Sequence, residues 1–282
     1  INAAGRMNHA NAALHLLIEE DETRATELAQ ELQQTNTERQ KASEEMFKEA
    51  LEQVGDPGEE KLIVVVKEGW PVGLVGLVAG KLCSKFSRPV FVVGKKGKEF
   101  VGSGRSVEGF NVTQALHAAE KYLDRFGGHP QACGFSTSEQ DRFDQAVVLM
   151  KQFAKDNIKD EDLLPLIKID SVLSPDLVDW DLYHQLQKFA PFGQANPHPL
   201  FVKKGLQANQ INTVGADQKH LKLTVRTDSG KMIRTIGFNF GAWAEQLAVG
   251  DFVDLVYEVG VNEWNGNREL QFKIVDLKKT QE

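Results

Sequence analysis

An uninterrupted apolar run, Leu62-Ile63-Val64-Val65-Val66, β-branched at every residue after Leu62, is the feature that most constrains the fold of this chain. A continuous apolar run of this length is typical of a strand buried on both faces. A helical pattern follows at residues 72–86, and a second apolar strand at 89–93. This order predicts an α/β unit.

The next hundred residues continue the alternation of strands and helices. A hairpin turn at 95–98 leads into a strand at 99–103, and helices are expected at 112–125 and 141–158. Between those helices, Phe126 to His129 reads as a tight glycine loop that enters a strand at 132–137. The pattern predicts a small mixed sheet.

A long polar helix precedes this unit. Residues 19–52 contain no Gly or Pro and are rich in Glu and Gln, which favours helix. Apolar residues gather near its two ends, whereas 33–40 offer no apolar stripe, as in a helix that bridges two domains through solvent. A surface helix or a partial coiled coil is the alternative.

The character of the chain changes after the charged segment 159–162. Six strand-like segments follow at 166–172, 200–208, 220–227, 231–238, 252–259 and 269–277, with short helices at 176–189 and 243–247. Hairpin turns are expected at 227–231 and 264–267. Several short strands with a helix between them predict a small barrel of the OB type.

The length, composition and net charge of the chain limit the classes of protein to which it can belong. A chain of 282 residues with 41% hydrophobic and 26% charged residues suits two globular domains, and no apolar run is long enough to cross a bilayer. Two cysteines are too few for a disulfide framework, which favours a reducing cytoplasm. Because the net charge is −7, the chain could bind nucleic acid only through local clusters of Lys and Arg. The sequence opens at Ile1, which reads as the middle of a longer polypeptide.

Two glycine-rich segments suggest a phosphate site. Ser103 and Arg105 lie in Gly-Ser-Gly-Arg-Ser after a strand, where a hydroxyl and a guanidinium can bind a phosphate. Gly127, Gly128 and His129 follow one helix later, and in a strand–helix–strand unit the two segments could converge. The alternatives are a flexible strand-end loop with a solvated arginine and ordinary turn glycines.

Other candidate residues lie at the two ends of the chain. Arg6 follows a small-residue turn and could reach an anion, or only cap and solvate the next helix. In the last segment Lys219, Lys222, Arg226 and Arg234 interleave with aromatic residues, as in barrels that hold single strands. The alternative is that the aromatics are barrel core and the lysines serve solubility. The sequence shows no metal-ligand cluster, no Walker-A lysine and no nucleophile elbow, so no catalytic residue and no metal ligand is assigned.

Several separated motifs resemble the RecJ family, the bacterial single-strand-specific 5′→3′ DNA exonucleases of the DHH phosphoesterase superfamily. The resemblance covers essentially the whole chain. It is carried by residues 1–7, 69–70, 73–79, 102–106, 127–135 and 191–199.

The resemblance implies a domain order and a set of roles. Residues 1–18 would be the tail of a catalytic DHH domain, 19–54 a connecting helix, 55–160 a DHHA1 domain and 161–282 an OB-fold domain. Arg6, Ser103, Arg105, Gly128 and His129 would hold phosphates near the 5′ end of single-stranded DNA. Mn²⁺ or Mg²⁺ ions would be bound by DHH-domain residues outside this chain. The chain alone is therefore expected to bind single strands and to hydrolyse nothing.

The resemblance further implies a cytoplasmic monomer that acts in DNA repair and recombination, with other repair or replication proteins as potential partners. Pro71 stands where the family usually has His, Cys133 where it has a small residue, and Ala195 where Gly is common. Two other functions stay open: a DHH-type phosphodiesterase of short oligonucleotides or cyclic dinucleotides, and a non-catalytic interaction module.

Overall fold

The computed structural model describes residues 1–7, 9–264 and 266–280. The chain divides into two compact units, Ile1–Pro165 and Leu166–Glu282. Within the described residues, no helix is both long and apolar enough to cross a membrane.

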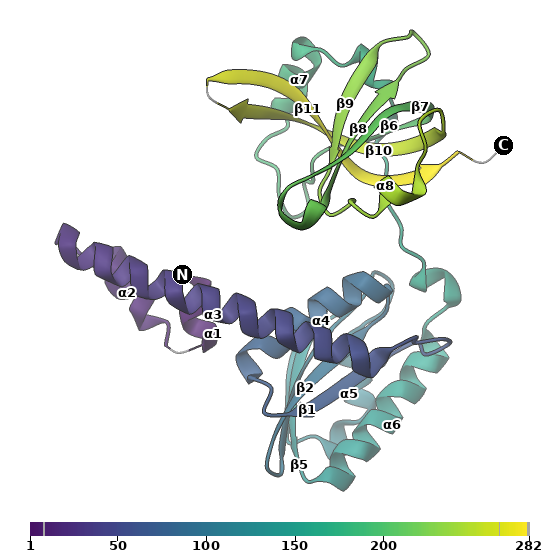
Figure 1. Ribbon diagram of the computed structural model, residues 1–282. Coiled ribbons are helices and arrows are strands. Elements are labelled where there is room, and N and C mark those ends of the chain that lie inside the picture. The colour runs from purple at the N-terminus through teal and green to yellow at the C-terminus, as the bar shows by residue number, and fades with distance from the viewer. Residues whose placement is uncertain (8, 265, 281–282) are drawn as a thin grey trace. The chain divides into compact units, whose positions relative to one another are not determined.

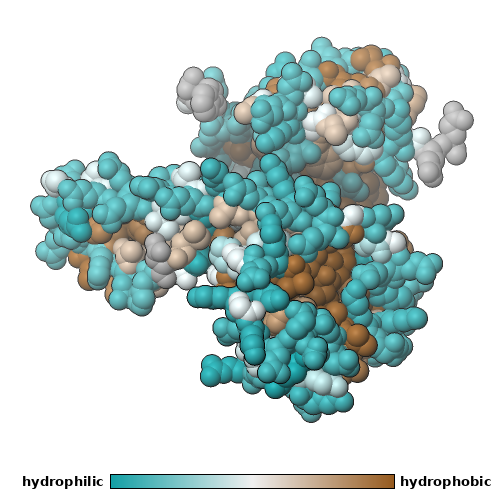
Figure 2. Space-filling view, turned by 60° about the horizontal axis from the view of Figure 1, so that its bottom comes forward, coloured by the Kyte–Doolittle hydropathy of each residue, from teal (hydrophilic) through white to brown (hydrophobic). Residues whose placement is uncertain are grey.

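Three helices form an arm at the start of the first unit: α1 (Asn2–Met7), α2 (Asn11–Ile18) and α3 (Glu22–Val54) (Figure 1). The turn expected around Arg6 is therefore the helix α1, in which the small side chains of Ala3 and Ala4 are buried. Figure 2 shows apolar surface on this arm, to which α2 contributes exposed leucine and isoleucine side chains.

The 33-residue helix α3 matches the expected long helix, and it begins at Glu22 because the Asp21 carboxylate accepts a hydrogen bond from the Arg24 amide at 2.8 Å. Leu32, near its first end, is buried beneath α1 and α2, whereas Met46 and Ala50 pack against the sheet. The stretch between these contacts is largely exposed, as its polar sequence predicts.

The first unit is built on a five-stranded sheet in the order β1-β2-β3-β5-β4. β1 and β2 are parallel and joined by helix α4, and the other neighbours are antiparallel. The elements are β1 (Ile63–Glu68), α4 (Val72–Phe86), β2 (Val90–Lys96), β3 (Glu99–Arg105), α5 (Val112–Ala118), β4 (Arg125–His129), β5 (Ala132–Ser138) and α6 (Gln140–Asn157).

Helices cover both faces of this sheet, so that side chains of β1 are covered on both sides, as its apolar run predicts. Ile63 and Val65 of β1 pack with α3 and α4 on one face. Phe91 and Phe100 pack with α5 and α6 on the other face, where Phe100 stacks on Phe143 with ring centroids 4.4 Å apart. The mixed α/β architecture expected from the sequence is confirmed.

One local expectation in this unit is wrong. The helix expected to reach Arg125 ends at Ala118, and the presumed glycine loop is the edge strand β4. Gly128 has φ +150°, and a Cβ there would lie 2.4 Å from the carbonyl oxygen of Ala132, so close pairing with β5 requires glycine. Glycine is depleted in strands, and the local pattern therefore indicates a loop.

The second unit is a closed five-stranded barrel, which confirms the expected OB-type fold. The strands pair in the order β7-β8-β9-β11-β10, and β10 returns to pair with β7. Among the described residues of these five strands, β9 and β11 pair in parallel and the other neighbours are antiparallel. The strands are β7 (Leu200–Val214), β8 (His220–Arg226), β9 (Met232–Gly237), β10 (Phe252–Trp264) and β11 (Asn267–Lys279), and the helix α8 (Trp243–Gln246) joins β9 to β10.

The barrel core surrounds the fully buried Tyr257, whose hydroxyl donates to the Leu173 carbonyl at 2.9 Å. Of the strand expected at 166–172, only β6 (Ser171–Val172) pairs, beside β7. The helix expected at 176–189 is a 3-10 turn, η3 (Pro175–Leu177), followed by α7 (Trp180–Gln187). The hairpin turn expected at 264–267 includes Asn265, which lies outside the described residues.

Candidate nucleic-acid-binding surfaces

Ser103 and Arg105 lie on strand β3 and point to the face of the sheet that α4 covers in part. The Arg105 guanidinium donates to the Ser103 hydroxyl at 2.9 Å and to the Gly104 carbonyl at 2.7 Å. The Ser103 hydroxyl in turn donates to the Cys133 carbonyl at 3.1 Å. No carboxylate among the described residues pairs with Arg105. Its positive charge is therefore not neutralised by an ion pair, and further N–H groups remain to bind an anion.

The strand register places His129 and Gly127 on that same face. Arg105 pairs with Ala132 on β5, and Ala132 pairs with His129 on β4. In the next row, Ser103 pairs with Gly134 and Gly134 with Gly127. Directly paired residues project to the same side of a sheet, so the two segments converge as the sequence suggests.

We call this surface the glycine-floored site, made of Ser103, Arg105, Gly127, His129, Ala132 and Gly134. Its floor consists of glycine and alanine, which lets a ligand approach the backbone closely. His129 and Gly127 are exposed, and Arg105 is half-buried. Of the residues predicted for this site, Gly128 does not belong to it. Gly128 pairs with Cys133, which pairs with Gly104, and this row of residues faces the opposite side of the sheet.

Helix α4 connects this site to Arg6. A Cβ on Gly76 would lie 2.9 Å from the Arg105 side chain, and one on Gly73 would lie 2.1 Å from the Arg6 carbonyl oxygen. The exposed Arg6 side chain donates to the Gly73 carbonyl at 3.5 Å and pairs with no carboxylate in the described part of the chain. Arg6 and Arg105 therefore contact α4 one helical turn apart.

The sequence-based interpretation misses one cation on this face. Arg125 pairs with Ser136, in the row after Gly127 and Gly134, so its side chain projects to the same side as His129. It is exposed and makes no ion pair with the residues that the structure describes. The alternation Arg125, Gly127, His129 is the signal that could have revealed it, and interpreting the segment as a loop hides that alternation.

The second candidate surface is the outside of the β7-β8-β9 sheet of the barrel. Lys222, Arg226 and Arg234 project from it, because the alternate residues of these strands are buried in the core. None of the three makes an ion pair within the described residues. Lys219 does not belong to this surface, since it lies in the turn before β8 and pairs with Asp217 at 3.3 Å.

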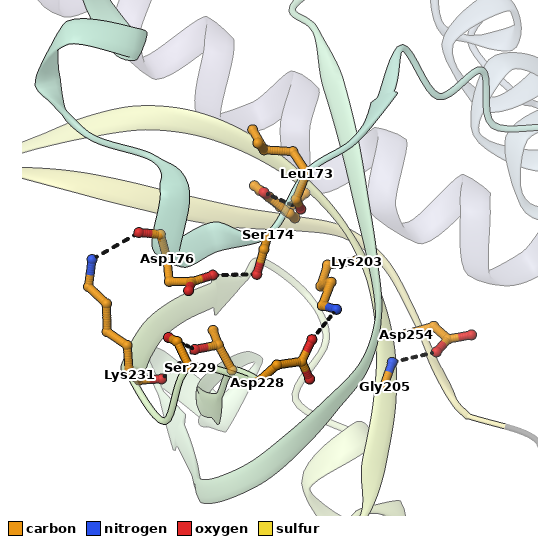
Figure 3. Close-up of polar contacts among 11 residues, drawn as sticks. Leu173, Ser174, Asp176, Lys203, Gly205, Asp228, Ser229, Lys231 and Asp254 are labelled. Carbon is orange, nitrogen blue, oxygen red and sulfur yellow. Dashed lines mark hydrogen bonds and ion pairs between the residues drawn. The ribbon is translucent and has the colours of Figure 1, made fainter.

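Lys203 and Lys231, by contrast, have intramolecular partners. Figure 3 shows Lys203 bound to Asp228 at 2.6 Å and Lys231 donating to the Asp176 carbonyl at 3.3 Å. These contacts hold the β8–β9 turn in place. Lys222, Arg226 and Arg234 therefore form a group of unpaired cations on the outside of β8 and β9.

The aromatic residues expected beside these cations divide into two groups. Phe201 is buried, and Phe240 and Trp243 pack against the barrel core, as expected from the alternative interpretation that the aromatics are core residues. Phe238 is 51% exposed and lies directly after β9.

No three His, Cys, Asp or Glu side chains of the described residues gather in a way that could hold a metal ion. The Mn²⁺ or Mg²⁺ that the resemblance implies therefore does not fit these residues.

Comparison with known proteins defines the class. Residues 59–156 match the DHHA1 domain family, and residues 169–276 match the RecJ OB domain family. The chain therefore carries a DHHA1 domain followed by an OB domain.

The particular resemblance is to RecJ, the single-stranded-DNA-specific exonuclease. The chain is 36% identical over 279 residues to RecJ of Bacillus subtilis, covering 98% of this chain and 35% of that protein. It is 31% identical over 281 residues to RecJ of Thermus thermophilus, covering 99% of this chain and 39% of that protein. The crystal structure of Thermus thermophilus RecJ in complex with Mg²⁺ superposes with a TM-score of 0.83 at 29% identity, covering 100% of this chain and 42% of that one. The chain thus spans well under half the length of these relatives.

Proposed function

We propose that this chain is the substrate-binding part of a RecJ-like exonuclease that degrades single-stranded DNA from the 5′ end. The glycine-floored site binds phosphates of the DNA strand. The outside of the β7-β8-β9 sheet of the barrel guides the nucleotides that follow. One observation carries the proposal: Arg105, bonded to Ser103 and free of any carboxylate among the described residues, shares an open small-residue face with His129.

The chemistry of the site suits a phosphate. The guanidinium provides a fork of donors, the Ser103 hydroxyl fixes its orientation, and the exposed imidazole of His129 adds a further donor. Arg6 supplies a second guanidinium along α4. In this proposal divalent ions, which are bound in crystal structures of Thermus thermophilus RecJ, activate water at residues outside this chain.

The test is a binding titration of the full chain with a single-stranded oligonucleotide that carries a 5′-phosphate. Arg105→Ala should weaken binding by roughly 10- to 100-fold, because charge-assisted hydrogen bonds of about 1.5–3 kcal/mol are lost. The loss should be smaller for the same strand with a 5′-hydroxyl. Arg24→Ala is the matched control, since Arg24 is an exposed arginine paired with Glu27 at 2.8 Å.

An unchanged affinity for Arg105→Ala would contradict the phosphate role and favour an interaction module that docks a protein. A second measurement addresses catalysis. The purified chain with Mn²⁺ and a labelled single strand should release no nucleotides. Release that follows the chain through purification would refute the assignment of cleavage to residues outside it.

The basic outer surface of the barrel favours long strands over short oligonucleotides or cyclic dinucleotides. A substrate of two nucleotides is too short to extend along this surface. An enzyme that acts only on such substrates would therefore not use the surface. Affinity should therefore increase as the strand is lengthened from two nucleotides, and the increase should be lost when Lys222, Arg226 and Arg234 are replaced by alanine. An affinity independent of length would favour the phosphodiesterase of short substrates.

A further inference from the structure

Among the described residues of the barrel strands and their connections, two large aromatic side chains remain exposed on the outside of the barrel. Phe238 is 51% exposed and Phe252 is 54% exposed. Full burial of such a side chain is worth about 1.5–3 kcal/mol, so an exposed phenylalanine contributes little to folding. Their positions relative to the unpaired cations give them a different role.

The strand register places both rings at the edges of one surface. Phe252 pairs with Gln207, Gln207 with Arg226, and Arg226 with Met232, so these four side chains form one row. At the far end of β8, Val214 pairs with His220, whose ring contacts Phe238. The outer barrel face comprises these two rows and the residues between them: Gln210, Asn212, Lys222, Thr224, Arg234 and Ile236.

Positive charge lies between the two rings, and none of the residues named for this face carries a carboxylate. Arg226 is in the row of Phe252, Arg234 pairs with Thr224 in the next row, and Lys222 lies in the row before His220. A cavity of about 550 Å³ opens beside Arg234, and its lining includes Thr224, Met232 and the acidic Glu269. From Arg226 to His220 the face extends roughly 20 Å at about 3.3 Å per residue.

The Phe238 ring is supported from behind. It meets the His220 ring edge-on, with centroids 5.3 Å apart and an interplanar angle of 72°. His220 is held in turn because its Nδ1 accepts a hydrogen bond from the Asn239 amide at 3.1 Å. Gly215 leaves room for this ring, since a Cβ there would lie 2.8 Å from Cδ2 of His220. The contacts orient Phe238 while half of it stays open to solvent.

We infer that Phe238 and Phe252 are base-stacking platforms at the two ends of the outer barrel face, with the phosphates between them bound by Arg226, Arg234 and Lys222. Aromatic platforms beside a positively charged track are how proteins bind single strands without sequence preference. The inference rests on the proposed strand-guiding function of the barrel and adds to it the residues that contact bases.

The test compares Phe238→Ala and Phe252→Ala in the full chain, with Phe189→Ala as the matched control. Phe189 is 66% exposed and lies after α7, outside the barrel strands. Each platform variant should bind a long single strand roughly 5- to 100-fold more weakly, since stacking is worth about 1–3 kcal/mol per base. The control should bind as the unmodified chain does.

The salt dependence identifies the kind of contact that is lost. The platform variants should keep the slope of log affinity against log salt concentration, because stacking releases no counterions. Arg234→Ala should lower that slope by about one. Strands with abasic sites should bind the unmodified chain as weakly as intact strands bind the platform variants.

The outcomes separate the inference from the function on which it rests. If the unmodified chain and Arg234→Ala bind single strands equally, the barrel does not guide the strand and the proposed function fails there. If Arg234→Ala weakens binding while both platform variants bind normally, only the stacking role is overturned. Circular dichroism of each variant excludes misfolding as the cause of a loss.

Discussion

Gly76 of helix α4 lies against the guanidinium of Arg105, so closely that a Cβ on Gly76 would stand 2.9 Å from Nη2 of Arg105 and 3.2 Å from the Ser103 hydroxyl. The absence of a side chain at residue 76 is therefore what lets the guanidinium lie between the helix and strand β3. The position of Arg105 depends on α4 as much as on its own strand.

Gly76→Ala should displace the Arg105 side chain and weaken binding of a 5′-phosphorylated single strand by roughly tenfold, a loss of about 1.4 kcal/mol. Gly80→Ala is the matched control, because a Cβ there meets nothing within 4 Å. The control should keep full affinity and gain about 0.5–1 kcal/mol of stability, as expected when alanine replaces glycine inside a helix. Equal affinities of the two variants would show that α4 does not position Arg105.

Asp254 should make the barrel sensitive to acid. Its side chain is 9% exposed and accepts hydrogen bonds from the Gly205 amide at 3.1 Å and the Thr280 hydroxyl at 2.7 Å. Burial raises the pKa of Asp254, but these hydrogen bonds and Lys278 outweigh it and lower the pKa below its ordinary value. The stability that they contribute is thus present above the unfolded pKa of about 3.9 and is lost as the pH falls through the folded pKa.

Asp254→Asn should therefore cost about 1–3 kcal/mol at pH 7, and the cost should shrink below about pH 4. Urea unfolding followed by tryptophan fluorescence measures this, because Trp180, Trp243 and Trp264 of the four tryptophans lie in the barrel unit. A cost that stays constant from pH 7 down to about pH 3 would contradict the assignment to the charged carboxylate.

Ala195→Gly should stabilise the chain. Ala195 has φ +65°, a left-handed conformation that costs alanine roughly 1–2 kcal/mol, and glycine avoids this cost at some expense in unfolded-state entropy. We expect a net gain of about 0.5–1 kcal/mol in the free energy of unfolding. Ala242→Gly is the opposite control, because Ala242 has φ −59° and should lose stability on the same change.

Both cysteines should react slowly with thiol reagents in the native chain. Burial raises the pKa of Cys83 to about 11 and that of Cys133 to about 12, against a smaller opposing effect of Arg105. At pH 8 almost no thiolate is present, and the thiolate is the reactive form. Spectroscopic titration should find two reactive thiols only after denaturation. Rapid reaction of one thiol in the native chain would contradict this burial.

Local sequence patterns determined most of the elements and their class. The apolar run at 62–66 predicted a strand buried on both faces, and the structure has α3 and α4 on one face of its sheet and α5 and α6 on the other. The short strands with turn residues between them predicted a barrel, which closes through β10 and β7. These patterns are informative because burial imposes a periodicity that neighbouring residues share.

The candidate sites depended on pairings that no local pattern contains. Arg105 and His129 share a face because β5 lies between β3 and β4, although the local pattern of β4 indicates a loop. Lys219 and Lys222 look equivalent in sequence, yet one is ion-paired in a turn and the other projects from a strand. Which residues share a surface is set by strand order and register, and these are fixed by contacts between segments far apart in the chain.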